Sequence, residues 1–473
     1  MKTINKQTTS KDVVTTGKQR SYNEIVEFLD QNWKTNVSDT TLTCMKKLDQ
    51  AFGSLSQKLP SIVVGGTNGK SLTINFAAQL LKEEGLQVGT LYTPHLLTYN
   101  ERISFNNDLI SNKTFTEVGN DVINTAESLG LKANSGELLT MMALVYFKAN
   151  NADVILLETN DATIPQATTI CTPKIAAITR VTSDEVNAHD EVSREVIQSM
   201  LAMVRPGTHV ISADQSKLNL QVMLELVKDK GGIWGMPIRK LAPLTYPFEQ
   251  LHGRCAALAE RITHIYVNQF ANKDAVVVGG TLLTKQKGQR GRPTLEAKKE
   301  QERNPKRTIE QFWREAHHTL PGHFQLLDKE KPSLLLDVAS NLDAFKNLLL
   351  GIRLLHYQRP LKGLTLILGS NNPTLDTNEF MKLLRYFFKK TSGSVIVCPV
   401  EPVPGHKGAA SWDVEKITNE IKGMKIKARS SKNLKEAFEA ATKSVDERHG
   451  LVVIAGSPSL ISEFWRYKGI KKL

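Results

Sequence analysis

Short apolar runs alternate along this chain with longer stretches in which apolar residues recur at helical spacing. In the first part, five such runs predict strands, at Ser61–Val64, Gln87–Tyr92, Asp153–Leu157, Ile175–Val181 and Thr208–Ser212. The stretches between them predict helices, among them Leu72–Glu84 and Val192–Val204. Strands that alternate with helices are typical of α/β proteins with a mainly parallel sheet. We therefore expect a doubly wound α/β domain in this part of the chain.

A second alternation of the same kind begins at Ser333. Its apolar runs are "SLLLDVA", "LTLILG", "SVIVCPV" and "LVVIAG". Helices are predicted over Leu342–Leu355, after Asn378 and over Leu434–Val445. Because this alternation supplies a sheet of its own, the sequence predicts a second, smaller α/β domain that is Rossmann-like.

On this pattern the chain divides into a flexible basic tail at 1–20, a first domain at 21–319 and a second domain at 320–473. The first domain carries a basic insert at 284–307. Between Lys285 and Arg307, nine Lys or Arg residues stand against three Glu, which is typical of a solvated excursion. Its "RGRP" resembles the core of an AT-hook, which enters the minor groove of DNA. A nucleic-acid-binding protein is therefore a rival hypothesis, although this single short match does not lead us to expect nucleic acid as the partner.

Charge, cysteines and the longest apolar runs narrow the class of protein. The net charge of +13 suits an anionic nucleotide and substrate as well as a nucleic acid. The four cysteines show no metal-ligand spacing and fit a reducing compartment. No apolar run approaches the ~20 residues that span a bilayer, and the N-terminus lacks the apolar region of a secretory signal. We expect a cytoplasmic protein without a membrane partner.

The stretch "GGTNGKS", Gly65 to Ser71, lies between a predicted strand and a predicted helix. Glycines there let backbone N–H groups turn toward an anion, and the helix N-terminus adds a partial positive charge. Lys70 can reach the outer phosphates of a nucleotide, and Ser71 can hold Mg²⁺. The spacing is one residue shorter than in the common phosphate loop, and an ordinary glycine turn is the alternative. In this context the sequence predicts a P-loop-type, doubly wound ATP-binding domain.

Several segments, in the same order along the chain, resemble one family. "GTNGK" resembles the ATP loop of the ATP-dependent amide ligases that include folylpolyglutamate synthase/dihydrofolate synthase and the muramyl peptide ligases. "GTLYTPHLLTYNERISFNNDLIS" is similar to a segment of the folate branch, and "GELLTMMALVYF", "LPGHFQLL", "LLLDVASN" and "IAGSPSLISE" follow in the family order. The resemblance runs from about Ser61 to Glu463 and is patchy between Thr159 and Thr319. The chain is thus identified as a divergent member of the folylpolyglutamate synthase/dihydrofolate synthase family.

The resemblance implies a reaction and a set of site residues. ATP would phosphorylate a carboxylate of folate or dihydropteroate, and the amine of L-glutamate would displace the phosphate to form an amide. ATP and Mg²⁺ are the implied cofactors, these small molecules the implied partners, and a monomer the implied state. Lys70 and Glu137 are the implied catalytic residues. The implied cofactor contacts are Gly66, Thr67, Asn68, Gly69, Lys70, Ser71, His323 and Asp337. The implied metal ligands are Ser71, Thr93, Glu137 and Glu185.

Two loops of the first domain depart from the family pattern. "ETNDATIPQAT", Glu158 to Thr168, lacks the family's glycines. Glu185 stands where the family has a metal-binding histidine, and glutamate is a hard oxygen ligand that suits Mg²⁺.

Other departures concern single positions. The lysine that this ligase group carbamylates falls near Met200, His323 replaces an arginine, and Ser340 replaces a histidine. Arg254 lies near the place of a missing asparagine and can make a phosphate or adenine contact instead. A catalytically impaired ATP-binding paralogue therefore remains an alternative, as does a muramyl-type amino acid ligase, which the "TPHL" and "ERI" segments disfavour.

Overall fold

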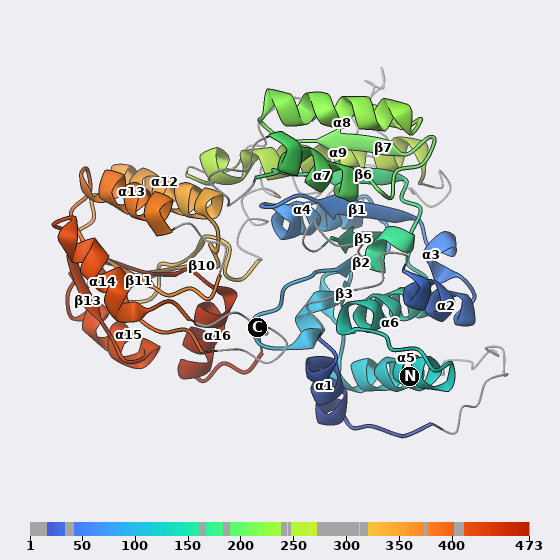
Figure 1. Ribbon diagram of the computed structural model, residues 1–473, viewed down its shortest axis with the longest axis horizontal. Coiled ribbons are helices and arrows are strands. Elements are labelled where there is room, and N and C mark those ends of the chain that lie inside the picture. Colours follow the sequence, from blue (N-terminus) through green and yellow to red (C-terminus); the bar gives the residue numbers. More distant parts are fainter. Residues whose placement is uncertain are drawn as a thin grey trace, which may run out of the picture.

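A computed structural model of the chain describes residues 17–33, 42–159, 167–182, 190–237, 244, 247–271, 312, 320–372, 377–401 and 411–472, with the backbone alone for 190–193. They form two lobes, each built on its own β-sheet (Figure 1). The predicted fold class, one mainly parallel α/β unit followed by a smaller one, is confirmed. The basic insert at 284–307 and the first sixteen residues of the tail lie outside the described residues, so what the sequence predicts for them stays a prediction.

The first lobe contains an eight-stranded sheet in the order β4-β3-β2-β5-β1-β6-β7-β8. Its strands are β1 (Ser61–Gly65), β2 (Val88–Leu91), β3 (Ile103–Phe105), β4 (Asp108–Leu109), β5 (Val154–Glu158), β6 (Ile175–Ile178), β7 (His209–Ser212) and β8 (Ile233–Gly235). The run from β2 to β8 pairs in parallel, whereas β3 and β4 are antiparallel additions at one edge. All five predicted strands are present, and β3, β4 and β8, with two or three residues each, were not predicted.

Helices cover both faces of this sheet. They are α1 (Tyr22–Gln31), α2 (Thr43–Ala51), α3 (Leu55–Lys58), α4 (Lys70–Glu83), α5 (Asn112–Ser128), α6 (Ser135–Ala149), α7 (Asp190–Met200), α8 (Lys217–Asp229) and α9 (Phe248–Gln269), with short 3₁₀ turns at Tyr99–Arg102 and Ala167–Ile170. Successive strand residues point to opposite faces, so Ile62 and Val64 pack with α4 and α9 whereas Val63 packs with α5 and α6. β1 is buried on both sides, which explains its uninterrupted apolar run.

The second lobe contains a six-stranded sheet in the order β13-β12-β11-β14-β10-β9. Its strands are β9 (Gln325–Leu327), β10 (Ser333–Asp337), β11 (Leu364–Leu368), β12 (Ser394–Val397), β13 (Lys427–Ser430) and β14 (Leu451–Ala455). Its helices are α12 (Leu342–Gln358), α13 (Thr377–Phe388), α14 (Val414–Gly423), α15 (Leu434–Thr442) and α16 (Pro458–Tyr467). Only β9 runs antiparallel, against β10. The four apolar runs quoted from the sequence form β10, β11, β12 and β14, while β9 and β13 were not predicted.

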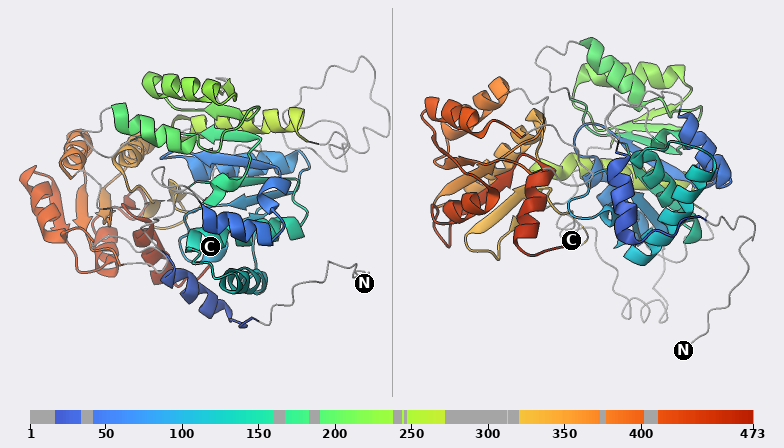
Figure 2. Two further views of the ribbon diagram at one scale, coloured as in Figure 1. Left: turned by 45° about the vertical axis from the view of Figure 1, so that its right-hand side comes forward. Right: turned by 60° about the horizontal axis from the view of Figure 1, so that its bottom comes forward.

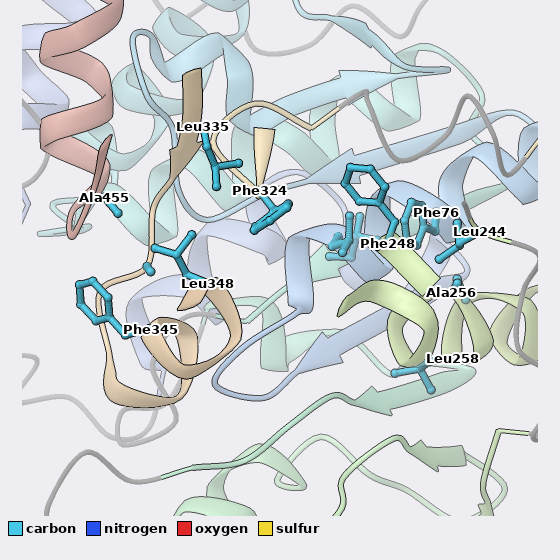
Figure 3. Packing of buried hydrophobic residues seen from close by; sticks show 14 of the residues in the cluster. Phe76, Leu244, Phe248, Ala256, Leu258, Phe324, Leu335, Phe345, Leu348 and Ala455 are labelled. Atoms are coloured by element: carbon cyan, nitrogen blue, oxygen red, sulfur yellow. The ribbon is translucent and has the colours of Figure 1, made fainter. Parts of the chain in front are cut away.

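The two lobes share one apolar core at their junction. α9, drawn in yellow-green, reaches from the first lobe toward the second in Figures 1 and 2. Its Phe248 meets Phe324 edge to face, with 6.1 Å between the ring centroids, and both belong to a cluster that continues to Phe345 on α12 (Figure 3). A Cβ atom at Gly351 of α12 would lie 2.3 Å from the Phe324 ring. A glycine at this position therefore lets α12 approach the junction closely.

No helix in the described ranges is both long and apolar enough to cross a membrane.

Candidate functional site

The predicted phosphate loop connects β1 to α4 and owes its shape to two glycines. Gly66 and Gly69 have φ angles of +130° and +89°, which favour glycine. A Cβ atom would lie 2.0 Å from Thr179 Oγ1 at Gly66 and 2.8 Å from Cys255 Sγ at Gly69. Both positions therefore exclude larger residues for steric as well as conformational reasons.

Lys70 folds back over this loop. Its Nζ donates to the carbonyl oxygens of Gly66 at 2.9 Å and Thr67 at 3.1 Å. The N–H of Thr67 is bonded to the carbonyl of Arg180, which follows β6. The lysine is thus held over the loop at the N-terminus of a long helix, where the backbone dipole also favours an anion.

Three oxygen-bearing residues meet beside the loop. The Ser71 hydroxyl lies 3.0 Å from both carboxylate oxygens of Glu158, and the Thr93 N–H donates to the same carboxylate at 3.3 Å. Glu158 ends β5, the strand next to β1, and is 2 % exposed. Burial raises the pKa of Glu158, while the charge of Lys70 and the hydrogen bonds from Ser71 and Thr93 oppose that rise.

This group of oxygens suits Mg²⁺. A carboxylate and two hydroxyls are the hard donors that this ion prefers, and it retains several waters of its own. Among the described residues there is no cluster of three or more His, Cys, Asp or Glu side chains. Ser71, Thr93 and Glu158 would therefore hold Mg²⁺ together with water and phosphate oxygens, where it would neutralise charge on the phosphates.

The other predicted metal ligands are placed differently. Glu137 lies in the first turn of α6, where its carboxylate accepts from the Asn134 N–H at 2.9 Å and Asn134 Oδ1 accepts from the Glu137 N–H at 3.0 Å. This reciprocal pair is a capping box. Glu185 lies outside the described residues.

From the second lobe, Asp337 at the end of β10 accepts from the N–H groups of Phe324 at 2.9 Å and Ala339 at 2.8 Å. Burial nevertheless raises the pKa of Asp337 to about 7. The His323 Nδ1 lies 2.9 Å from the Pro321 carbonyl, to which it donates. Burial lowers the pKa of His323 and the charge of Lys70 adds to this effect, so His323 is neutral at neutral pH.

A polar bridge joins the phosphate loop to α12. Asn68 and Asn341 exchange amide hydrogen bonds of 3.1 and 2.9 Å, and Asn68 also donates to Asp343 at 3.0 Å. Asn341 caps α12, since its Oδ1 accepts from the Ala344 N–H at 2.9 Å. Asp343 is also 2.7 Å from a guanidinium nitrogen of Arg180. The end of the phosphate loop is therefore fastened to the second lobe.

All these groups line one cavity of about 980 Å³ between the lobes. Of the described residues predicted for the site, the cavity is lined by Thr67, Asn68, Gly69, Lys70, Ser71, Thr93, Glu137, His323 and Asp337. Gly66 is not part of this lining. The sequence interpretation missed Glu158, Arg180 and Asp343, which also line the cavity.

The positions that depart from the family pattern are also placed by the structure. Met200 is 5 % exposed in an apolar cluster, and its Cγ would lie 3.9 Å from a Cβ at Gly65, so an uncharged side chain occupies this place behind the loop. Ser340 lines the cavity, and its carbonyl accepts from the Asn372 amide at 2.7 Å. Arg254 of α9 lines it as well.

Known proteins resemble this chain in sequence over part of its length and in fold over nearly all of it. No protein-family model matches the chain. The dihydrofolate synthase/folylpolyglutamate synthase of Bacillus subtilis is 27% identical over 221 residues, which cover 46% of this chain and 48% of that protein. The chain thus spans about half the length of this curated relative.

Solved structures match over nearly the whole chain. Mycobacterium tuberculosis folylpolyglutamate synthase complexed with ADP has a TM-score of 0.72 at 19% identity, covering 95% of this chain and 98% of that one. The bifunctional folylpolyglutamate synthase/dihydrofolate synthase of Yersinia pestis, complexed with AMPPNP and a Mn ion, has a TM-score of 0.70 at 18% identity, covering 96% and 100%.

Fold and site together define a two-domain α/β protein with a phosphate loop facing an interdomain cavity. Over the segments that match, the chain is similar to folylpolyglutamate synthase/dihydrofolate synthase proteins, and its fold is that of the solved folylpolyglutamate synthases.

Proposed function

We propose that this chain is an ATP- and Mg²⁺-dependent ligase that joins L-glutamate to a carboxylate of folate or dihydropteroate. The observation that carries the proposal is the convergence on one cavity of the phosphate loop, the Ser71, Thr93 and Glu158 oxygens and Asp337 of the second lobe. The names of the relatives and the nucleotide complexes of the structural neighbours support the same reaction.

In this reaction a carboxylate oxygen of the pterin substrate attacks the γ-phosphorus of ATP, and ADP leaves. The amine of glutamate then attacks the acyl carbon, loses a proton, and inorganic phosphate leaves with the C–O bonding electrons. Such a transfer depends on positioning and charge neutralisation rather than on covalent chemistry by the protein. Lys70 and the N-terminus of α4 would neutralise charge on the phosphates, and the second lobe contributes part of the cavity wall that would limit access of water.

The residues that depart from the family pattern, Met200 and His323, raise the alternative that the chain is a catalytically impaired ATP-binding paralogue. Met200 and the neutral His323 remove two charges that the family pattern would supply, whereas Ser71, Thr93 and Glu158 retain oxygen donors for one metal ion, with water and phosphate oxygens as its other ligands. We therefore favour an active ligase organised around one metal ion held by the protein.

The test is ADP release by the purified chain with ATP, Mg²⁺ and glutamate, comparing dihydropteroate with tetrahydrofolate. Release that depends on a pterin substrate, and that the Lys70→Ala variant lacks, supports the ligase and identifies its acceptor. If ATP binds but no pterin-dependent release exceeds that of Lys70→Ala, the chain is a nucleotide-binding paralogue and the proposal is wrong.

A further inference from the structure

The guanidinium of Arg102 is buried, and the reaction proposed above assigns it no function. It ends the 3₁₀ turn Tyr99–Arg102, is 3 % exposed and lines the interdomain cavity. Its Nε donates to His95 Nδ1 at 2.8 Å. The centre of the guanidinium lies 4.7 Å from the Trp33 ring centroid and 5.4 Å from that of Tyr99. The aromatic faces and the imidazole thus fix its plane.

This guanidinium has an unpaired donor and no carboxylate in direct contact among the described residues. One of its terminal nitrogens, NH2, is buried without a hydrogen-bond partner. Within the described ranges, Arg102 forms no ion pair. The adjacent carboxylate of Glu101 instead accepts the N–H groups of Leu96, Leu97 and Thr98, at 2.7 to 2.9 Å. A buried, unpaired charge is costly, and natural proteins retain one where a ligand supplies the partner.

Arg102 stays charged at neutral pH. Burial lowers the pKa of the guanidinium to about 10, against the opposing effect of Tyr99, Glu158 and Glu101. The site therefore offers a positive charge with an unpaired N–H donor, to which a carboxylate can bind.

The position of Arg102 indicates which anion it meets. Its carbonyl accepts from the Tyr92 N–H at 2.7 Å, directly before Thr93, so it lies beside the Ser71, Thr93 and Glu158 group. The phosphate loop has a cation of its own in Lys70, whose Nζ lies against the loop carbonyl of Gly66. Trp33, which also lines the cavity, gives the guanidinium an aromatic neighbour against which a flat ring can pack.

We propose that Arg102 binds the carboxylate of the pterin substrate, the group that ATP phosphorylates, and aligns it with the γ-phosphate. This inference rests on the proposed ligase function and names its acceptor-binding residue. Arg102 is thus a binding residue for the acid and not for the nucleotide.

The experiment measures the affinity of the chain for dihydropteroate and for the same compound with a carboxamide in place of the carboxylate. Titrations are made by calorimetry with Mg²⁺ and a non-hydrolysable ATP analogue present. Wild type is expected to prefer the carboxylate by about 10- to 100-fold, as for a hydrogen-bonded ion pair. Arg102→Met is expected to remove this preference and leave the affinity for the amide unchanged. Arg102→Lys is expected to restore part of the preference.

Arg20 provides a matched control. It is a second buried arginine, with its guanidinium 5.3 Å from the Phe28 ring centroid, but it is paired with Glu127 at 2.6 Å and does not line the cavity. Arg20→Met should lose thermal stability and keep the full carboxylate preference. Arg102→Met, which removes an unpaired charge, should unfold at a temperature close to that of wild type.

The ADP release of wild type and the carboxylate preference of Arg102→Met together distinguish a wrong role for Arg102 from a wrong ligase function. If wild type releases ADP with a pterin substrate but Arg102→Met retains the carboxylate preference, the ligase stands and the role of Arg102 is wrong. A weaker affinity of Arg102→Met for the ATP analogue, with the carboxylate preference kept, assigns Arg102 to phosphate and also overturns the inference. If wild type binds neither pterin compound and releases no ADP, both proposals fail.

Discussion

The hydroxyl of Ser71 lies 3.0 Å from both carboxylate oxygens of Glu158. Ser71, which follows Lys70, is therefore hydrogen-bonded to the end of β5, the strand beside β1. This contact makes the carboxylate of Glu158 part of the phosphate site. Glu137, the glutamate that the motif resemblance implied as a metal ligand, accepts a hydrogen bond from the Asn134 N–H at the start of its own helix.

Two glutamine variants test whether Glu158 or Glu137 coordinates Mg²⁺. Glu158→Gln keeps the size of the side chain but removes the negative charge beside Ser71, so we expect the apparent Mg²⁺ affinity in the ligase assay to fall by about 10- to 100-fold or more. Glu137→Gln is the matched control, because glutamine also serves in a capping box, and its Mg²⁺ dependence should stay close to wild type. Equal losses in the two variants would contradict this assignment.

The amide pair between Asn68 and Asn341 predicts a measurable coupling between the lobes. Alanine at either position removes the reciprocal hydrogen bonds, and alanine at 341 also removes the cap of α12, at about 1 kcal/mol. In a double-mutant cycle measured by urea unfolding, we expect a coupling free energy of about 1 kcal/mol. Additive effects, within about 0.3 kcal/mol, would show that the two amides do not stabilise each other.

Asp337 predicts a dependence of stability on pH. Its pKa is raised in the folded chain, from 3.8 to about 7, so the folded state binds the proton more tightly than the unfolded state does. The resulting stabilisation is complete below about pH 4 and is lost as the pH rises through 7. Relative to Asp337→Asn, wild type should therefore lose on the order of a few kcal/mol of unfolding free energy between pH 4 and pH 7. A difference that stays constant over this range, in urea titrations, would refute the raised pKa.

Two glycine-to-alanine variants test the junction core. At Gly351 the new methyl group would meet the Phe324 ring at 2.3 Å and Leu251 at 3.0 Å, so we expect a loss of about 1–3 kcal/mol in unfolding free energy. Gly423, the last residue of α14, is the control: a Cβ there meets no atom within 4 Å. Gly423→Ala should be neutral or stabilising by up to about 1 kcal/mol, because alanine favours the helix. A Gly351→Ala protein as stable as wild type would mean that Phe324 moves aside without cost.

The strands and helices that could be predicted from the sequence are those whose own residues show a clear apolar run or a helical spacing of apolar residues. β1, β5 and β14 are buried on both faces and read as continuous apolar runs. The missed strands β3, β4 and β9 have two or three residues each, and their pairing with β2 or β10 depends on partners that no local pattern reveals.

The phosphate loop was predictable because its residues are adjacent in sequence, whereas the rest of the site is assembled from distant segments. Glu158 carried a usable signal, since a carboxylate directly follows a predicted buried strand, at the edge where ligands bind in parallel sheets. Arg180 and Asp343 carried none, because the ion pair between them joins segments of the two lobes that are far apart in sequence.

Asn68 belongs to the phosphate loop and also contacts α12, because its amide donates to Asn341 and Asp343. A nucleotide bound at the loop would thereby be linked to the docking of the second lobe. If ATP shifts the chain toward the docked arrangement by some factor, then a ligand held by the second lobe must tighten ATP binding by that same factor. A nucleotide would then bind most tightly when a ligand of the second lobe is already in place.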